Sequence, residues 1–217
     1  ETNGLYILDS KMKEVGSITG LAEGEQVYSA RLLGDTGYFV TYEQVDPLFS
    51  VDLSDPEKPK ILGKLKIPGF SEYLHFYGED RLLGIGMSTD EESGVAEGVK
   101  ITMFNISDRS DVKEESTLVL DDLYGSHAAY DYKSVLADPE KNVIGLSGYS
   151  QNGESYYLLT YNRTDRKFET ILQEEVNGNT SQGIRGIYIE DTLYVISGNI
   201  IEAYDMNTGV KSGDIIL

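Results

Sequence analysis

The sequence lacks cysteine and tryptophan altogether. Without cysteine, the chain has no disulfide bond, no thiolate ligand for a metal and no cysteine nucleophile. Long hydrophobic runs are also missing, because no stretch approaches the roughly 18 apolar residues that span a bilayer. No stretch has the pattern of a signal peptide either. We therefore expect no transmembrane segment in this chain, and a core that uses the 16 tyrosines where other proteins use tryptophan.

Positive charge is scarce. The 18 lysines and arginines are outnumbered by 37 aspartates and glutamates, which gives a formal net charge of −19 at pH 7. Such a charge repels nucleic acids and anionic membrane surfaces, so we expect no nucleic-acid partner. The surplus of carboxylates favours solubility, and it leaves cation binding open. A chain without cysteine is also compatible with a bacterial secreted protein.

The segment Val27–Gly69 has the pattern of four short strands, and the rest of the chain repeats it. Tyr38–Tyr42 consists of aromatic and β-branched residues, as in a strand buried on both faces. Glycine and aspartate in Gly34–Gly37 and two prolines in Ser54–Pro59 favour turns between strands. Lys60–Ile67 alternates apolar residues with lysine, which is typical of a half-exposed edge strand. The segment therefore predicts a meander of four antiparallel strands.

An aspartate or asparagine ends the third strand of each repeat and serves as its anchor. The five anchors Asp9, Asp52, Asn105, Asn162 and Asp205 are 43, 53, 57 and 43 residues apart. These intervals fit blades of a β-propeller with loops of variable length. Asp and Asn suit the position because their side chains can close a turn between the two outer strands. The fold class predicted is all-β, a propeller of four-stranded antiparallel blades.

About four and a half blades are present in a single domain, residues 1–217. We expect a half blade at 1–20 and blades at about 27–69, 70–122, 130–177 and 183–217. Such a set does not close a ring, so we expect a fragment of a larger propeller or an incomplete ring. The exposed blade edges of an open ring would allow dimer formation.

The stretch Tyr38–His75 resembles a known family. The pieces that carry the resemblance are Val45–Phe49, Asp52–Pro56, Leu62–Gly63, Ile67–Gly69 and Tyr73–His75. They are similar to secreted bacterial and archaeal proteins that carry a C-terminal β-propeller domain. The resemblance implies an extracellular or cell-surface protein, with no settled activity to carry over. The family often has histidine where this chain has Tyr132, so a metal or catalytic role resting on that histidine does not transfer.

Three long loops are the best places for a ligand, since propellers bind along their axis or on the face formed by loops. The loops are Thr89–Gly98, Asp121–Lys133 and Gln151–Glu154. Four tyrosines could stack on a sugar ring or a peptide, or they could pack between blades: Tyr124, Tyr130, Tyr132 and Tyr149. The predicted ligand-binding residues are His75, Tyr124, His127, Tyr130, Asp131 and Tyr132.

The metal prediction rests on carboxylates rather than on histidines. His75 and His127 are the only histidines, and they lie 52 residues apart in different blades. A structural, hydrogen-bonded histidine therefore suits each of them better than a zinc site, which needs two or three histidines together. Calcium accepts carboxylate and carbonyl oxygens in flexible geometry, so Asp121, Asp122 and Asp131 are candidate ligands. The alternative is solvated loop charge. No other cofactor and no catalytic residue are predicted.

Two functions remain open. The first is a non-enzymatic, extracellular scaffold or binding module for a protein or glycan partner, bound at the loop face. The alternative is a carbohydrate-active hydrolase with carboxylates in the channel, since glycoside hydrolysis uses two acids ~5–10 Å apart. One feature distinguishes the two functions. A hydrolase needs two or more carboxylates that converge in one cleft and have perturbed pKa values.

Overall fold

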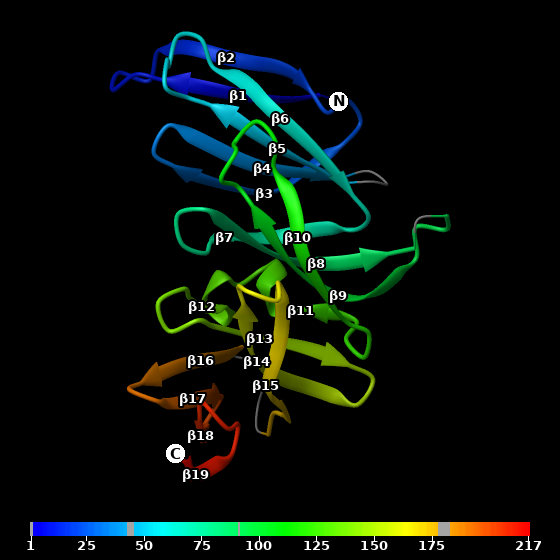
Figure 1. Ribbon diagram of the computed structural model, residues 1–217, viewed down its shortest axis with the longest axis vertical. Coiled ribbons are helices and arrows are strands. Elements are labelled where there is room, and N and C mark those ends of the chain that lie inside the picture. The colour runs from blue at the N-terminus through cyan, green and yellow to red at the C-terminus, as the bar shows by residue number, and fades with distance from the viewer. Residues whose placement is uncertain (1, 43–45, 91, 178–182) are drawn as a thin grey trace.

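A computed structural model describes residues 2–42, 46–90, 92–177 and 183–217. Val45, Glu91 and most of the predicted linker 177–182 lie outside the described residues. The described chain consists of β-strands and two short 3-10 helices. Figure 1 shows the sheets following one another along the long axis, with the N-terminal sheet at one end and the C-terminal sheet at the other.

Each sheet is built from consecutive strands in antiparallel order. The N-terminal sheets comprise β1 (Asn3–Leu8) and β2 (Glu14–Leu21), then β3 (Gln26–Leu33), β4 (Thr36–Tyr42), β5 (Asp46–Asp52) and β6 (Lys60–Ile67). The third sheet comprises β7 (Phe70–Phe76), β8 (Arg81–Thr89), β9 (Ala96–Asn105) and β10 (Lys113–Leu120). The last comprises β16 (Ile184–Ile189), β17 (Thr192–Ser197), β18 (Ile200–Asp205) and β19 (Lys211–Ile216).

The fourth sheet differs from the others in its inner strand. Its outer part is regular: β13 (Val143–Ser150), β14 (Gly153–Asn162) and β15 (Lys167–Glu175). Two short strands, β11 (Gly125–Ser126) and β12 (Leu136–Asp138), both pair with β13. Between them lie the 3-10 helices η1 (His127–Ala129) and η2 (Tyr132–Ser134).

Side-chain caps explain why this inner strand is interrupted. The Ser126 hydroxyl accepts a hydrogen bond from the Ala128 N–H at 3.2 Å, and the Asp131 carboxylate accepts one from the Lys133 N–H at 3.0 Å. Ser and Asp at such positions divert the backbone from pairing with a neighbouring strand. The segment predicted as irregular, Asp121–Lys133, contains both of these turns.

The prediction that the five anchors close turns is confirmed. Each anchor oxygen accepts a hydrogen bond from the backbone N–H two residues later. The distance is 2.8 Å for Asp9, 2.9 Å for Asp52 and 3.0 Å for Asn105, Asn162 and Asp205. The repeated turn, the all-β content and the successive antiparallel sheets confirm the predicted β-propeller fold. The sheets do not close into a ring.

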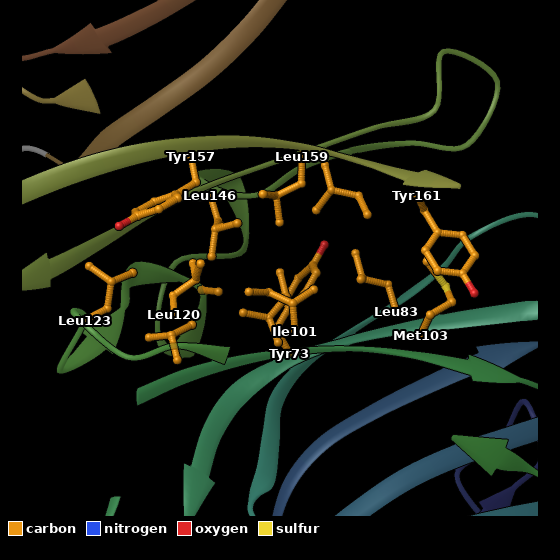
Figure 2. Packing of buried hydrophobic residues seen from close by; sticks show 14 of the residues in the cluster. Tyr73, Leu83, Ile101, Met103, Leu120, Leu123, Leu146, Tyr157, Leu159 and Tyr161 are labelled. Carbon is orange, nitrogen blue, oxygen red and sulfur yellow. The ribbon is translucent and has the colours of Figure 1, made fainter. Parts of the chain in front are cut away.

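Buried tyrosines pack among aliphatic residues in three of the four cores that the described residues form between successive sheets, in a chain that has no tryptophan. The largest core lies between the β7–β10 sheet and the β11–β15 sheet. Figure 2 shows Tyr157, Leu159 and Tyr161 of β14 facing Leu83 and Ile101 across it. Burial of such large side chains is the main stabilising contribution to the fold. The loop tyrosines, by contrast, are exposed.

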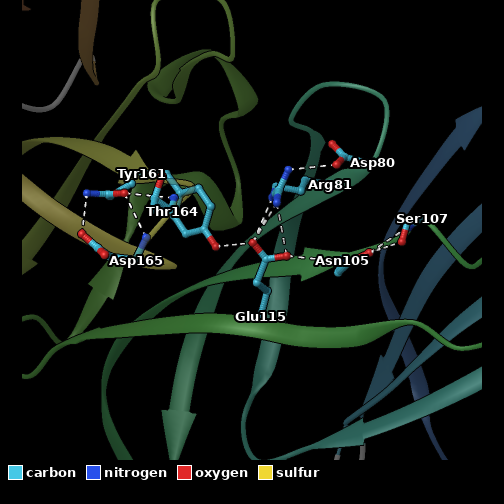
Figure 3. A network of polar contacts seen from close by, with 9 residues as sticks. Asp80, Arg81, Asn105, Ser107, Glu115, Tyr161, Thr164 and Asp165 are labelled. Carbon is cyan, nitrogen blue, oxygen red and sulfur yellow. Dashed lines mark hydrogen bonds and ion pairs between the residues drawn. The ribbon is translucent and has the colours of Figure 1, made fainter.

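A buried ion pair within the β7–β10 sheet lies at one end of this core, and a tyrosine of the next sheet donates a hydrogen bond to it (Figure 3). The Glu115 carboxylate on β10 lies 3.0 Å from the Arg81 guanidinium on β8, and the Tyr161 hydroxyl on β14 donates to it at 2.6 Å. Asn105 also donates to Glu115, at 3.3 Å. Because the Glu115 side chain is only 2% exposed, these partners replace the water it loses. The pair is therefore structural.

The end sheets lack a neighbour on one side within the described chain. Every residue of β19 is exposed, and the β1–β2 sheet has only two strands. Large apolar side chains lie exposed at both ends, among them Tyr6 and Leu8 of β1 and Ile187, Ile189 and Ile215 near the C-terminus. In the part of the chain that the structure describes, no helix has the length and hydrophobicity needed to cross a bilayer.

Candidate functional site

His127 lies at the centre of the candidate site, on η1, where the fourth sheet loses its regular inner strand. The imidazole is buried, with 6% of the residue exposed. Its Nδ1 lies 3.0 Å from the Ser147 hydroxyl on β13, and its Nε2 lies 3.2 Å from Glu154 Oε2 on β14. The second contact lacks hydrogen-bonding geometry, and Glu154 Oε2 is buried without a hydrogen-bond partner among the described residues. His127 is thus held in place from two strands.

Two tyrosines stand around this imidazole. The rings of Tyr130 and Tyr149 meet His127 edge to face, with centroids 5.5 Å and 5.9 Å from the imidazole. Burial raises the pKa of Tyr130, and the nearby Tyr149, Glu154 and Asp131 raise it further. The Tyr130 hydroxyl therefore lies close to two carboxylates. We call His127, Tyr130, Tyr149 and Glu154 the His127 cluster.

The strand pairing explains how this cluster assembles. Tyr149 of β13 pairs directly with Glu154 of β14 across the hairpin, so their side chains lie on the same face. Ser147 lies two residues before Tyr149 and shares that face. The segment after β11 folds back over this face and brings His127 and Tyr130 onto it. The sheet therefore positions Tyr149 directly, whereas Tyr130 is placed by the segment that folds back over the sheet.

The remaining predicted tyrosines lie nearby in the chain but outside this cluster. Tyr124 is 59% exposed and lines a groove of about 300 Å³ with Glu97, Asp121 and Leu123. The predicted loops Thr89–Gly98 and Asp121–Lys133 therefore meet at one groove. Tyr132 is exposed, and its ring lies 5.8 Å from the Lys133 ammonium.

His75 lies on a different sheet from Tyr149 and Glu154 of the His127 cluster. It lies on β7 of the third sheet, with Nδ1 3.0 Å from the Tyr73 hydroxyl. Burial lowers the pKa of His75, and the positive charge of Arg31 lowers it further. The structure does not bring His75 into contact with the His127 cluster.

The three candidate calcium ligands do not come together. Asp122 accepts hydrogen bonds from Tyr157 at 2.6 Å and Gln173 at 3.3 Å, Asp131 caps η2, and Asp121 is exposed. Among the described residues, no group of three or more His, Asp or Glu side chains is placed to hold a metal ion. Calcium binding stays a prediction, which melting curves recorded with calcium and with a chelator would test.

Sequence reasoning missed Ser147, Glu154, Arg31 and Tyr73. The partners of each lie in other strands, and no local pattern shows which strands will be neighbours. One signal was present: Tyr149 and Glu154 flank a short turn between two strands, which places them opposite each other in a hairpin.

The chain resembles two archaeal proteins over nearly all of its length. It is 40% identical over 217 residues to an uncharacterised protein of Archaeoglobus fulgidus, covering 100% of this chain and 32% of that protein. It is 37% identical over 206 residues to an uncharacterised protein of Methanocaldococcus jannaschii, covering 95% of this chain and 30% of that protein. The chain thus spans about a third of the length of these relatives.

Solved structures match the fold at much lower identity. A putative 6-phosphogluconolactonase from Bacteroides fragilis has a TM-score of 0.61 and 12% identity, with 100% of this chain and 65% of that chain covered. Saccharomyces cerevisiae Sqt1 has a TM-score of 0.59 and 15% identity, with 88% of this chain and 48% of that chain covered. These likenesses show the fold alone. The β-propeller domain family matches residues 1–209, and the chain belongs to that family.

Proposed function

We propose that this propeller is a non-enzymatic binding module, acting outside the cell, that recognises a protein or glycan at the loop face. The observation that carries the proposal is the His127 cluster. Tyr130 is 69% exposed and Tyr149 is 39% exposed, yet both contact a buried imidazole held from two strands. Exposed aromatic rings on a rigid support offer contact area at a small entropic cost.

The polar groups beside the tyrosines suit the same purpose. Glu154 and Asp131 lie close enough to Tyr130 to raise its pKa, so acceptors adjoin the aromatic rings. A sugar presents apolar ring faces together with hydroxyl donors, and a peptide presents apolar side chains together with N–H donors. An aromatic surface with carboxylates at its border matches either ligand. The location outside the cell is supported by the resemblance to secreted proteins.

The hydrolase alternative receives less support. It needs two carboxyl groups in one cleft, one of them with a raised pKa. Burial raises the pKa of Glu72 on β7, but no second carboxyl group among the described residues contributes to that shift. Glu115, the carboxylate most enclosed by polar partners, has a lowered pKa and serves as a structural ion-pair partner.

A binding assay with matched tyrosine variants tests the proposal. The protein is applied to arrays of glycans and of peptides, and the affinity for each hit is measured by calorimetry. Tyr130→Ala and Tyr149→Ala should each weaken binding at least tenfold, which corresponds to about 1.4 kcal/mol. Tyr6→Ala is the control, because Tyr6 is 56% exposed but lies on β1, in a different sheet from the His127 cluster.

Two results would count against this function. One is an equal loss of affinity in Tyr6→Ala, which would mean that exposed tyrosines bind without selectivity. The other is release of reducing sugar from an array glycan, with loss of that activity in Glu72→Gln. That outcome would favour the hydrolase alternative.

A further inference from the structure

Three side chains with hydrogen-bond donors meet where the inner strands β3 and β7 lie side by side. The Arg31 guanidinium on β3 lies 5.0 Å from the centre of the Tyr73 ring on β7. The Tyr73 hydroxyl lies 3.0 Å from Nδ1 of His75, and the two rings are nearly parallel, with centroids 6.0 Å apart. Tyr73 therefore links a cation to an imidazole across two neighbouring sheets.

Arg31 has no acidic partner among the described residues. Its Nη1 donates to the Ala30 carbonyl at 2.9 Å. Burial raises the pKa of Tyr73, and a side-chain hydrogen bond from Arg31 lowers it against that larger effect. Among the described residues Arg81 is the arginine that forms ion pairs with carboxylates, so Arg31 is one of several arginines without such a partner. Arg81, by comparison, contacts both Asp80 and Glu115. A planar guanidinium, with five N–H donors, is suited to a bidentate carboxylate.

His75 supplies a second donor. Burial raises the pKa of Tyr73, so the phenol keeps its proton and can donate it to Nδ1 of His75. Burial and then the charge of Arg31 lower the pKa of His75, which favours the neutral imidazole. In that tautomer the single imidazole proton lies on Nε2. Among the described residues, Arg31 is the charged group that acts on His75.

We propose that Arg31 and His75 form a binding site for one carboxylate group, of the kind carried by a uronic acid or by an aspartate or glutamate side chain. One positive charge beside one neutral donor balances a single negative charge. A phosphate dianion would bring a second, uncompensated charge into a chain that already carries −19. The site shares no residue with the His127 cluster, although β7 lies beside η1 and Tyr73 packs in the same core as Ala128.

The two histidines make a direct test possible. Because the chain has only His75 and His127, proton NMR can follow the titration of each imidazole separately. The ligands are D-glucuronate, which represents a sugar acid, and N-acetyl-glutamate amide, which represents a protein carboxylate. D-glucose and inorganic phosphate are the comparisons. Salt at about 0.15 M screens the acidic surface over distances beyond about 8 Å.

We expect a bound carboxylate to raise the pKa of His75 by about one unit, because an adjacent negative charge favours the imidazolium. The effect should saturate with ligand and leave His127 unchanged, and glucose should have no effect. A response to glucuronate alone identifies a sugar acid, whereas a response to the glutamate derivative alone identifies a protein carboxylate. A response to both identifies a site for the carboxylate group itself.

Two variants complete the design. Arg31→Gln should abolish the carboxylate response and, without ligand, raise the pKa of His75, since Arg31 lowers it. Unfolding would also raise the pKa of His75, because burial is the largest cause of its lowering, so an unchanged urea midpoint must show that the variant is folded. Arg31→Lys keeps the charge and loses the planar fork, so it should bind more weakly than the native chain. The proposal is overturned by the absence of a saturable His75 response, by equal responses of both histidines, or by a stronger response to phosphate.

Discussion

The Tyr161 hydroxyl on β14 donates a 2.6 Å hydrogen bond to the Glu115 carboxylate on β10, and this bond joins two consecutive sheets. Burial is the largest cause of a raised pKa at Tyr161. The hydrogen bond to Glu115 and the negative charge of Glu115 add to it, and the pKa rises to about 12. The phenol therefore stays protonated and donates to the carboxylate throughout the neutral range. A polar contact at the border of an apolar core thus sets how the two sheets meet.

Removing the Glu115 charge should destabilise the protein strongly. Glu115→Gln leaves the Arg81 guanidinium, whose side chain is 12% exposed, without its most buried partner. Breaking a buried ion pair costs about 3–5 kcal/mol of the free energy of unfolding. Tyr161→Phe removes one hydrogen bond to a charged group and should cost about 1.5–3 kcal/mol. Urea denaturation would measure both.

A control for this pair is Lys113→Gln, which breaks an ion pair with Asp111 at the surface. Exposed pairs contribute little, so the urea midpoint should not change measurably. If Glu115→Gln proves as harmless as Lys113→Gln, then the ion pair does not hold the sheets together.

Acid should weaken this contact before neutral or alkaline conditions do. Burial acts to raise the pKa of Glu115, but hydrogen bonds from Tyr161 and Arg81 and the charge of Arg81 lower it below its ordinary 4.5. A lowered pKa contributes stability that is complete above the unfolded value and is lost as the pH falls through the folded value. Stability should thus fall below about pH 4.5. In Glu115→Gln this fall should be shallower, and identical acid profiles would contradict the assignment.

Removing the Tyr156 hydroxyl should stabilise the protein or leave its stability unchanged. The hydroxyl is fully buried between the fourth and fifth sheets and has no hydrogen-bond partner among the described residues. A buried polar group without a partner costs about 1–3 kcal/mol. Tyr156→Phe keeps the ring and removes that cost. A lower urea midpoint in Tyr156→Phe would mean that the hydroxyl has a partner, such as a water molecule.

The glycine opposite this ring should not tolerate a side chain. A Cβ atom on Gly186 of β16 would lie 1.8 Å from the Tyr156 hydroxyl oxygen and 2.4 Å from the ring carbon that carries it. Gly186→Ala should therefore destabilise by about 1–3 kcal/mol through overpacking. Gly213→Ala is the control, because a Cβ at Gly213 meets no atom within 4 Å. Equal thermal midpoints for the two variants would contradict this packing.

The fold could be read from local patterns because its repeat is local. The anchors, glycine turns and alternating strands each involve residues a few positions apart, and adjacent strands pair with each other. The fourth sheet was harder to predict from the sequence. In the blade predicted at about 130–177 the inner strand is interrupted, with η2 ending at Ser134 and β12 at Leu136–Asp138. The hydrogen bonds that the Ser126 and Asp131 side chains accept from the backbone explain why the strand is interrupted there.

The candidate site could be predicted only in part. Exposed tyrosines in an irregular loop indicated the region around His127, and the structure places Tyr130 beside it. Its other neighbours, Ser147 and Glu154, come from β13 and β14, and their position depends on how the loop folds back over those strands. Such contacts follow from tertiary packing, and no spacing in the sequence encodes them.

Each apolar core of this protein lies between two consecutive sheets, so its stability should add up over neighbouring pairs as in a one-dimensional array. An interior sheet then has two stabilising neighbours and an end sheet has one. Amide hydrogens of β18 and β19 should exchange earlier than those of β8 and β9, as the array opens from its ends inward. The His127 cluster, which depends on the fourth sheet, would keep its shape while the ends open.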